Sequence, residues 1–184
     1  MKDLSLHILD IVQNSIAAKA TFIEITIEES HQDNSYWVRI KDNGKGIPQE
    51  MLEKVTDPYV TSRTTRKVGL GLPLLKMNAE RTGGHLKISS KEGIGTKVEA
   101  LFIHNNIDRL PLGDMAGTIS IMASANPLIE FVYTHTVDGE QYIFDTREIK
   151  DALEDVAIND IHIFKYLKEM INENLQKIKA AENE

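Results

Sequence analysis

The chain has 184 residues, of which 41% are hydrophobic and 27% are charged, and its formal net charge is −7. This length suits one generous domain or a domain with an appendage, and the ordinary globular composition excludes wholesale disorder. The acidic balance argues against non-specific binding to nucleic acid or to anionic membranes, and the absence of cysteine excludes disulfides and thiolate metal sites.

The first part of the chain predicts a helix followed by two strands. Apolar residues recur at three- and four-residue spacing over residues 4–20, which is the pattern of an amphipathic helix. Residues 21–29 and 36–42 each alternate apolar and polar positions on either side of a polar turn, so we expect an antiparallel hairpin. A glycine-containing loop then leads into a short helix over residues 49–55.

A second helix and a second hairpin follow. The helix is expected over residues 72–81, where Pro73 is tolerated in the first turn and two glycines end the pattern. Residues 86–90 and 97–102 form the second hairpin. Together these elements predict an α+β fold in which two helices cover a mixed sheet as a two-layer α/β sandwich.

The character of the chain changes after about residue 105. A connector over residues 110–114 is followed by two strands, residues 131–136 and 141–145, joined through an Asp-Gly pair that suits a tight turn. Helices are expected over residues 146–153 and 160–179. We therefore divide the chain into an N-terminal domain of residues 1–104 and a C-terminal hairpin and helix extension of residues 105–184, which either completes the sheet or binds a partner.

Asp10 and Asn14 lie four residues apart on the first helix and so project from one face. A carboxylate beside a carboxamide suits a magnesium–nucleotide site, because the amide oxygen is a hard ligand and the carboxylate can orient a water. The alternative is a polar stripe on a solvated face. His7 shares this face and is either a proton carrier or a packed side chain.

Asp42 shares strand parity with Val38 and Ile40, which places its carboxylate on the face that should be buried. A buried carboxylate needs a hydrogen-bond donor, and the exocyclic amine of adenine is one. The glycines at 44 and 46 let the backbone pass close to a flat base. The alternative is an ordinary turn, since Asp-Asn-Gly is also a common hairpin sequence.

A glycine-rich segment, Gly69-Leu70-Gly71, comes directly before the second helix, where free N–H groups and the helix dipole attract phosphate. The polar stretch of residues 57–67 before it carries arginine, lysine and hydroxyl side chains and fits a lid over a triphosphate. An ordinary solvated loop is the alternative. The turn of residues 93–96 needs no ligand by itself.

In this order, the four segments resemble the GHKL superfamily of gyrase B, Hsp-type chaperones, histidine kinases and MutL-type ATPases. Residues 9–21 look like the family's N box, and residues 42–47 match its first glycine box. Residues 57–72 are similar to the lid and second glycine box of histidine kinases, and residues 93–96 fit the last box. The resemblance covers residues 4–103.

The resemblance implies a Bergerat-type ATP-binding fold with ATP and Mg²⁺ as cofactors. By it, Asn14 coordinates magnesium, Asp42 binds the adenine amine, and Thr96 assists there directly or through a water. Asp10 takes the place of the catalytic base. The remaining residues implied in nucleotide binding are Gly44, Gly46, Ile47, Thr61, Arg63, Lys67, Gly69, Leu70 and Gly71.

The chain departs from the family pattern in three ways. Asp10 stands where hydrolytic members carry glutamate, and it is shorter by one methylene. The chain begins almost at the N box, without the strands and the phosphoacceptor hairpin that precede it in histidine kinases, so autophosphorylation is not expected from this chain alone. The region after residue 105 has no counterpart, and we expect its hairpin to replace the missing strands or to form a partner surface.

We expect a slow magnesium-dependent ATPase whose nucleotide state regulates a protein partner. The alternatives are a serine/threonine protein kinase similar to the anti-sigma-factor kinases, a non-catalytic nucleotide sensor, and a purely structural role. No nucleic-acid or membrane partner is expected, and the oligomeric state stays open, with a dimer as one option. Because no signal-peptide core and no apolar run of membrane-spanning length are present, we expect a cytoplasmic protein.

Overall fold

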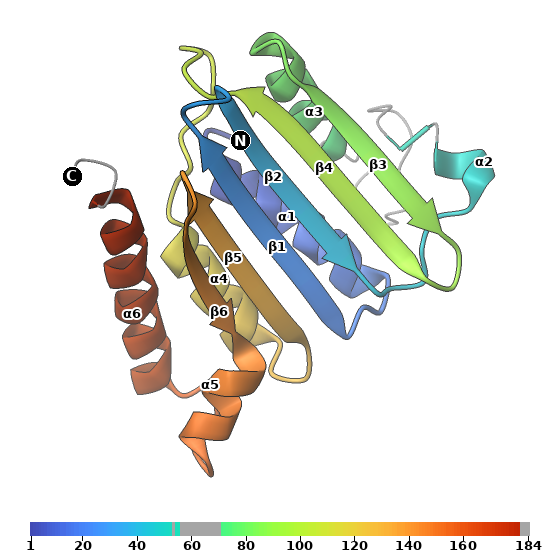
Figure 1. Ribbon diagram of the computed structural model, residues 1–184. Coiled ribbons are helices and arrows are strands. Elements are labelled where there is room, and N and C mark those ends of the chain that lie inside the picture. The colour runs from blue at the N-terminus through green and yellow to red at the C-terminus, as the bar shows by residue number, and fades with distance from the viewer. Residues whose placement is uncertain (53, 56–70, 181–184) are drawn as a thin grey trace.

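The computed structural model describes residues 1–52, 54–55 and 71–180, and within these a mixed six-stranded sheet organises the molecule (Figure 1). The strand order across the sheet is β3-β4-β2-β1-β5-β6. The strands are β1 (Phe22–Ser30), β2 (Ser35–Asp42), β3 (His85–Lys91), β4 (Gly95–Ile103), β5 (Glu130–Val137) and β6 (Glu140–Asp145). The helices are α1 (Leu4–Ala17), α2 (Gln49–Leu52), α3 (Gly71–Arg81), α4 (Met115–Ala125), α5 (Thr146–Leu153) and α6 (Ile161–Ala180).

Both predicted N-terminal hairpins are present, and they share a sheet. Strand β2 lies between β1 and β4 and pairs antiparallel with both, while β3 pairs antiparallel with β4 at the sheet edge. On the other side of β1, β5 pairs in parallel, with Ile25 opposite Tyr133. The C-terminal hairpin β5–β6 is therefore part of the same sheet, and the sheet continues across the boundary drawn at residue 105.

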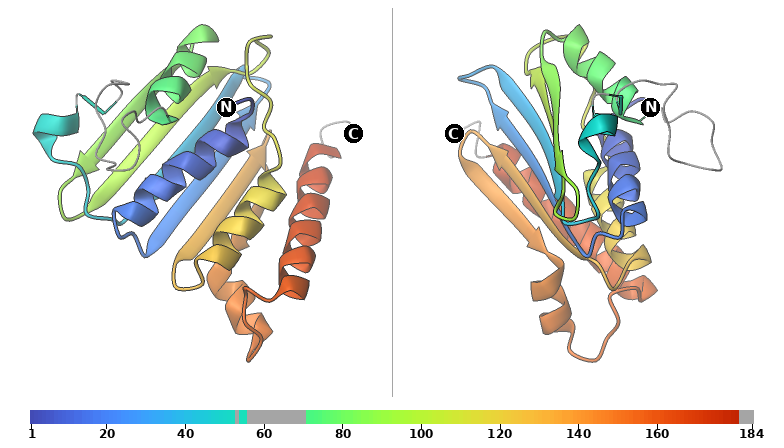
Figure 2. Two further views of the ribbon diagram at one scale, coloured as in Figure 1. Left: turned by 180° about the vertical axis from the view of Figure 1, so that it is seen from behind. Right: turned by 90° about the vertical axis from the view of Figure 1, so that its right-hand side faces the viewer.

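The helices α1, α3, α4 and α6 all lie on one face of the sheet, and the opposite face carries no helix from the described ranges (Figure 2). The alternation predicted for β1 explains this arrangement, because Ile23, Ile25 and Ile27 are fully buried beneath the helices. The two layers confirm the α+β sandwich. Two helices were predicted over the sheet, whereas α4 and α6 cover it as well.

Helix α4 is the element that sequence periodicity did not predict. Its side chains are buried nearly all round, because it packs against α1, α6 and β5. An apolar stripe marks a helix only when a polar face stands opposite, and a helix enclosed in this way has none. Its start is nevertheless marked, since the Asp114 side chain caps it by accepting a hydrogen bond from Gly117 N at 2.8 Å.

The ends of the other helices follow local signals. Asp3 caps α1 by accepting from Leu6 N at 3.1 Å, and α1 ends at Ala17, three residues before the predicted end, with Lys19 at a φ of 63°. Helix α3 ends at Arg81, followed by Gly83 at a φ of 89°. None of the helices in the described ranges has the length and apolar character needed to cross a membrane.

Candidate functional site

Asp42 ends strand β2 with its carboxylate turned toward α1, on the helix-covered face that its parity predicted. Its Oδ2 accepts a hydrogen bond from Ser15 Oγ at 2.6 Å. Its Oδ1 accepts from Gly44 N at 2.9 Å and from Thr96 N at 3.3 Å. Three donors from α1, the following loop and β4 thus fix the carboxylate. A carboxylate offers about four acceptor positions, so one position on Oδ2 stays available for a further donor.

The loop after Asp42 is held by the chain segments around it. A Cβ on Gly46, whose φ is 72°, would lie 2.2 Å from the Lys91 carbonyl oxygen. A Cβ on Gly95 would lie 1.9 Å from the Asp42 carbonyl oxygen. Lys45 N donates to the Ala18 carbonyl at 2.9 Å, at the C-terminal end of α1. Both positions require glycine because the backbone segments lie too close together for a side chain. This close contact fixes the loop against the β3–β4 turn.

The ends of β3 and β4 add a pair of hydroxyl groups beside this loop. Ser90 Oγ lies 2.8 Å from Thr96 Oγ1. The same Ser90 oxygen accepts from Ile47 N at 2.8 Å and lies 3.0 Å from the Gly95 carbonyl oxygen. Two site residues predicted from separate motifs, Ile47 and Thr96, are thus brought together through Ser90.

Asp10 and Asn14 are half-buried on α1, and Asp10 lies against the start of α3. A Cβ added to Gly71, the first residue of α3, would lie 1.8 Å from Asp10 Oδ2. The carboxylate therefore occupies the space that a side chain at position 71 would fill. The first turn of α3 presents backbone N–H groups that suit an anion.

His7, on the same side of α1, is packed into the interior. It is 1% exposed, and its Nε2 lies 3.2 Å from Asn78 Nδ2 on α3. Burial lowers the pKa of His7 below its ordinary value of 6.5, and the positive N-terminus lowers it further, against smaller opposing effects of the Gly71 backbone and Asp10. This side chain joins α1 to α3 rather than facing solvent as a proton carrier.

We name Asp10, Asn14, Ser15, Asp42, Gly71 and Thr96 the helix-face site. It lies between the sheet, α1 and the start of α3. Five predicted site residues, Thr61, Arg63, Lys67, Gly69 and Leu70, fall outside the described residues, as does the predicted lid of residues 57–67. Within the described ranges, no group of three or more His, Cys, Asp or Glu side chains could hold a metal ion. A nucleotide-bound Mg²⁺ needs only one or two protein oxygens, which Asn14 and Asp10 offer.

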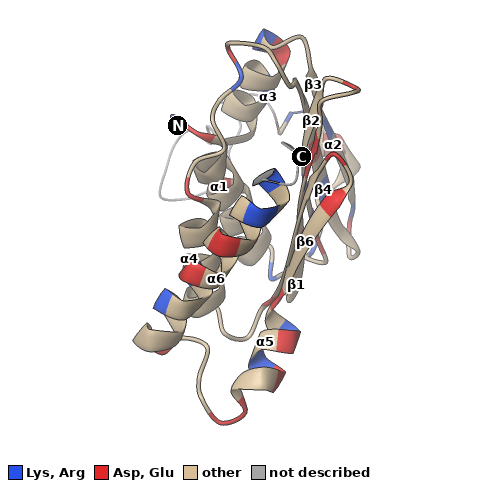
Figure 3. Ribbon diagram, turned by 60° about the vertical axis from the view of Figure 1, so that its left-hand side comes forward, with Lys and Arg blue, Asp and Glu red and all other residues tan. Residues whose placement is uncertain are grey.

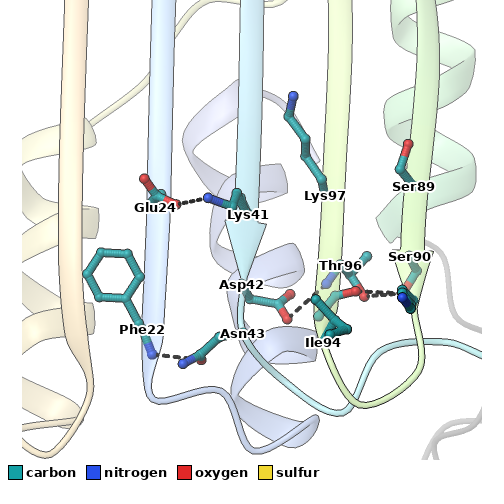
Figure 4. A pocket seen from close by; sticks show the side chains of 12 residues that line it. Phe22, Glu24, Lys41, Asp42, Asn43, Ser89, Ser90, Ile94, Thr96 and Lys97 are labelled. Atoms are coloured by element: carbon teal, nitrogen blue, oxygen red, sulfur yellow. Dashed lines mark hydrogen bonds and ion pairs between the residues drawn. The ribbon is translucent and has the colours of Figure 1, made fainter.

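A second feature at the same end of the strands lies on the other side of the sheet. It is a hollow of about 430 Å³. Figure 4 shows the side chains that line it, with the helices behind the strands. Side chains of Glu24, Lys41 and Lys97, which alternate away from the helices, surround it. Asp42 and Thr96 contribute to its lining from the ends of their strands, so the hollow and the helix-face site lie back to back.

Sequence reasoning did not single out Ser15 or Ser90. Ser15 belongs to the N-box segment, one residue after Asn14, but a serine inside a helix has no distinctive pattern. Ser90 lies at the end of an expected strand, where its sequence pattern implies no role in a site. Asn43 lies inside the first glycine box, and its structural role is not visible in the sequence. Its Oδ1 accepts from Thr21 N and Phe22 N, both at 2.9 Å, and so ties the loop to the start of β1.

Comparison with known sequences gives two findings. The profile of the family described as histidine kinase-, DNA gyrase B-, and HSP90-like ATPase matches residues 2–106. The chain is 34% identical over 91 residues to sporulation kinase D of Bacillus subtilis, and this segment is 50% of the chain but 18% of the kinase. The chain therefore corresponds to less than a fifth of that relative's length.

Comparison with solved structures extends the likeness beyond residue 106. The N-terminal domain of a DNA repair protein superposes with a TM-score of 0.58 and 19% identity, over 78% of this chain and 52% of that one. The Aquifex aeolicus MutL ATPase domain complexed with ADP gives a TM-score of 0.50 and 18% identity, over 84% of this chain and 70% of that one. At these identities the two structures share the fold with this chain.

Proposed function

The chain belongs to the family of histidine kinase-, DNA gyrase B- and HSP90-like ATPases, and from this membership we propose that its helix-face site binds ATP together with Mg²⁺. The family match covers more than half of the chain and confirms the resemblance carried by the four sequence segments. The observation that supports the site itself is the fixed carboxylate of Asp42, which keeps one acceptor position for a donor such as the adenine amine.

Four residues of the site contact the nucleotide, its metal or the attacking water in this proposal. Asp42 accepts a hydrogen bond from the adenine amine, and Thr96 contacts the base directly or through a water. The triphosphate extends toward the start of α3, where backbone N–H groups favour anions. Asn14 contributes an oxygen to Mg²⁺, which when bound neutralises phosphate charge. Asp10 orients the water that attacks the terminal phosphate and accepts its proton.

Binding is tested by isothermal titration calorimetry with MgATP, comparing the wild-type protein with Asp42→Asn. The carboxamide of asparagine presents either an NH₂ group or a weaker acceptor to the adenine amine and the Ser15 hydroxyl. We therefore expect the affinity for MgATP to fall by roughly tenfold or more, and each factor of ten corresponds to about 1.4 kcal/mol of binding free energy. Asp155→Asn is the matched control, because this exposed carboxylate lies in the C-terminal part of the chain. Equal affinity for all three proteins would refute the proposed role of Asp42.

ATP hydrolysis is tested with Asp10→Asn. The position of Asp10 adds a second expected effect, on nucleotide binding without Mg²⁺. A carboxylate against the start of α3 repels a triphosphate unless Mg²⁺ lies between them. We therefore expect Asp10→Asn to lose phosphate release from MgATP but to bind ATP several-fold more tightly than wild type in EDTA. Unchanged phosphate release in the variant would exclude Asp10 as the base.

We further propose that the ATPase cycle is slow and regulates a protein partner. The similarity to sporulation kinase D favours a second candidate, in which the terminal phosphoryl group of ATP is transferred to a protein substrate. With γ-labelled ATP, label released as inorganic phosphate supports the ATPase, and label retained on an added protein supports the kinase. Binding of ATP without release or transfer would instead indicate a nucleotide sensor.

A further inference from the structure

The uncovered face of β2, β4 and β3 has a charge opposite to that of the whole chain. Residues that alternate away from the helices on these three strands bring five cations and one carboxylate to this face, whereas the chain has a net charge of −7. The cations are Arg39, Lys41, Lys87, Lys91 and Lys97, and the carboxylate is Glu99. We name these six residues the cationic face. Along α5 and α6, by contrast, cations and carboxylates are interspersed (Figure 3).

The lysines of the cationic face differ in how they are paired. Lys41 Nζ lies 2.7 Å from Glu24, and Lys97 Nζ lies 2.7 Å from Glu99. Lys41 and Glu24 are both exposed, and Lys97 is exposed although Glu99 is partly buried, so a competing carboxylate can reach both lysines from solvent. Lys87 and Lys91 are exposed on β3, and neither has a carboxylate within 4 Å among the residues that the structure describes.

The hollow of about 430 Å³ lies at one end of this face, and its lining combines charge with apolar surface (Figure 4). Three lysines and two carboxylates line it together with two large apolar side chains: Lys41, Lys91, Lys97, Glu24, Asp42, Phe22 and Ile94. Ile94 is 63% exposed, which is high for a large aliphatic side chain. The lysines outnumber the carboxylates here, so the hollow favours a ligand that combines negative charge with an apolar group against Ile94.

Trp37, at the other end of β2, argues against nucleic acid as that ligand. The Arg39 guanidinium lies 4.5 Å from the centroid of the indole, and the His85 ring stands against it at 5.7 Å and 84°. Binding of single strands uses aromatic rings that are open for bases to stack.

We propose that the cationic face docks an acidic segment of a protein partner, with its carboxylates on Lys87, Lys91 and Lys97 and an apolar side chain in the hollow against Ile94. This surface supplies the partner contact that the proposed function requires. Docking on it does not need nucleotide, so it is tested without ATP, and its failure leaves the ATP-binding proposal unaffected.

The probe is a fluorescein-labelled peptide, Glu-Glu-Asp-Leu-Glu-Glu-Asp-Leu-Glu-Glu, whose binding to the full chain is followed by fluorescence anisotropy. We expect binding that weakens with added salt, because charge pairing at an exposed surface is screened. The double variant Lys87→Glu/Lys91→Glu should weaken it by roughly tenfold or more. The matched control is Lys165→Glu/Lys177→Glu, which makes the same change in net charge at exposed positions of α6 and should leave affinity within about twofold.

Three outcomes would overturn the proposal. Wild type could fail to bind the peptide at roughly millimolar concentration, an affinity too weak for recognition. Both double variants could lose binding equally, which would show an effect of net charge alone. A labelled oligothymidylate could bind more tightly than the peptide and lose binding only in Lys87→Glu/Lys91→Glu, which would identify a nucleic-acid surface. Circular dichroism of each variant verifies that it is folded.

Discussion

At the scale of single residues, two carboxylates on neighbouring strands have contrasting surroundings. Asp42, at the end of β2, is held by three donors and keeps an acceptor position at the helix-face site. Glu29, near the end of β1, is enclosed at the opposite end of the sheet. Its Oε1 lies 2.7 Å from His135 Nε2, and its Oε2 lies 3.4 Å from His104 Nε2. The first carboxylate suits a ligand, and the second joins β1 to β5 and to the residue that follows β4.

The pairing of Glu29 predicts how stability depends on pH. Burial by itself raises the pKa of Glu29, but hydrogen bonding and charge from His135, with Lys179 and His104, bring it below the ordinary value of 4.5. Because the folded pKa is the lower one, the ionised carboxylate stabilises the fold above pH 4.5. This stabilisation is lost as the pH falls through the folded pKa.

Glu29→Gln should therefore lower the free energy of unfolding by about 1–3 kcal/mol at pH 7, with a smaller difference from wild type at pH values below the folded pKa. Urea unfolding of both proteins across this range measures the difference. Glu140→Gln, at an exposed position of β6, is the control and should change stability by less than about 0.5 kcal/mol. A deficit that stays constant with pH would mean that packing, not ionisation, explains the effect.

At the scale of elements, α4 is a helix stabilised mainly by its packing against neighbouring elements. It lies between α1, α6 and β5 and brings the C-terminal region into the common core. Its two isoleucines lie on different sides of the helix: Ile119 is fully buried, whereas Ile121 is 50% exposed. A helix packed in this way contributes through the volume it fills rather than through intrinsic propensity.

Ile119→Ala should cost about 2–5 kcal/mol of unfolding free energy, because it removes buried methyl groups and leaves a cavity. Ile121→Ala, on the same helix and with the same chemistry, should cost less than about 1 kcal/mol. Chemical denaturation of the two variants gives the comparison. Similar losses at both positions would contradict the packing described for α4.

At the scale of the whole molecule, one sheet contains strands from both sides of residue 105, where the sequence changes character. The family profile ends at residue 106, yet β5 pairs with β1 along its length and α4 and α6 cover the same face as α1 and α3. The region that matches the family profile and the C-terminal region thus share one core. Removal of the C-terminal region would leave the outer edge of β1 unpaired.

A fragment of residues 1–106 should therefore unfold with reduced cooperativity or associate through β1, although it contains the whole family match. Thermal unfolding by circular dichroism, with light scattering to detect association, compares the fragment with the full chain. A monomeric fragment with an unchanged midpoint would show that the C-terminal region adds to the sheet without supporting it.

The sequence alone determined the features that depend on local order. Alternation predicted β1 and β2 and the side of Asp42, helical spacing predicted α1, and the proline and glycine signals at its two ends predicted α3. The four glycine- and asparagine-containing segments predicted the family and the α+β fold, and both are confirmed. The ligand roles of Asp10, Asn14, Asp42 and Thr96 stay predictions.

Tertiary structure decided what depends on segments far apart in the chain. Ser15 reaches Asp42 across 27 positions, and Glu29 meets His135 across 106, so neither pair leaves a local pattern. Local patterns also do not reveal α4, which has no polar face because it packs against neighbours on two sides. Nor do they reveal the parallel pairing of β5 with β1. The periodicity of apolar residues indicates which face of an element is buried. The elements that bury it are determined only when the whole chain folds around one core.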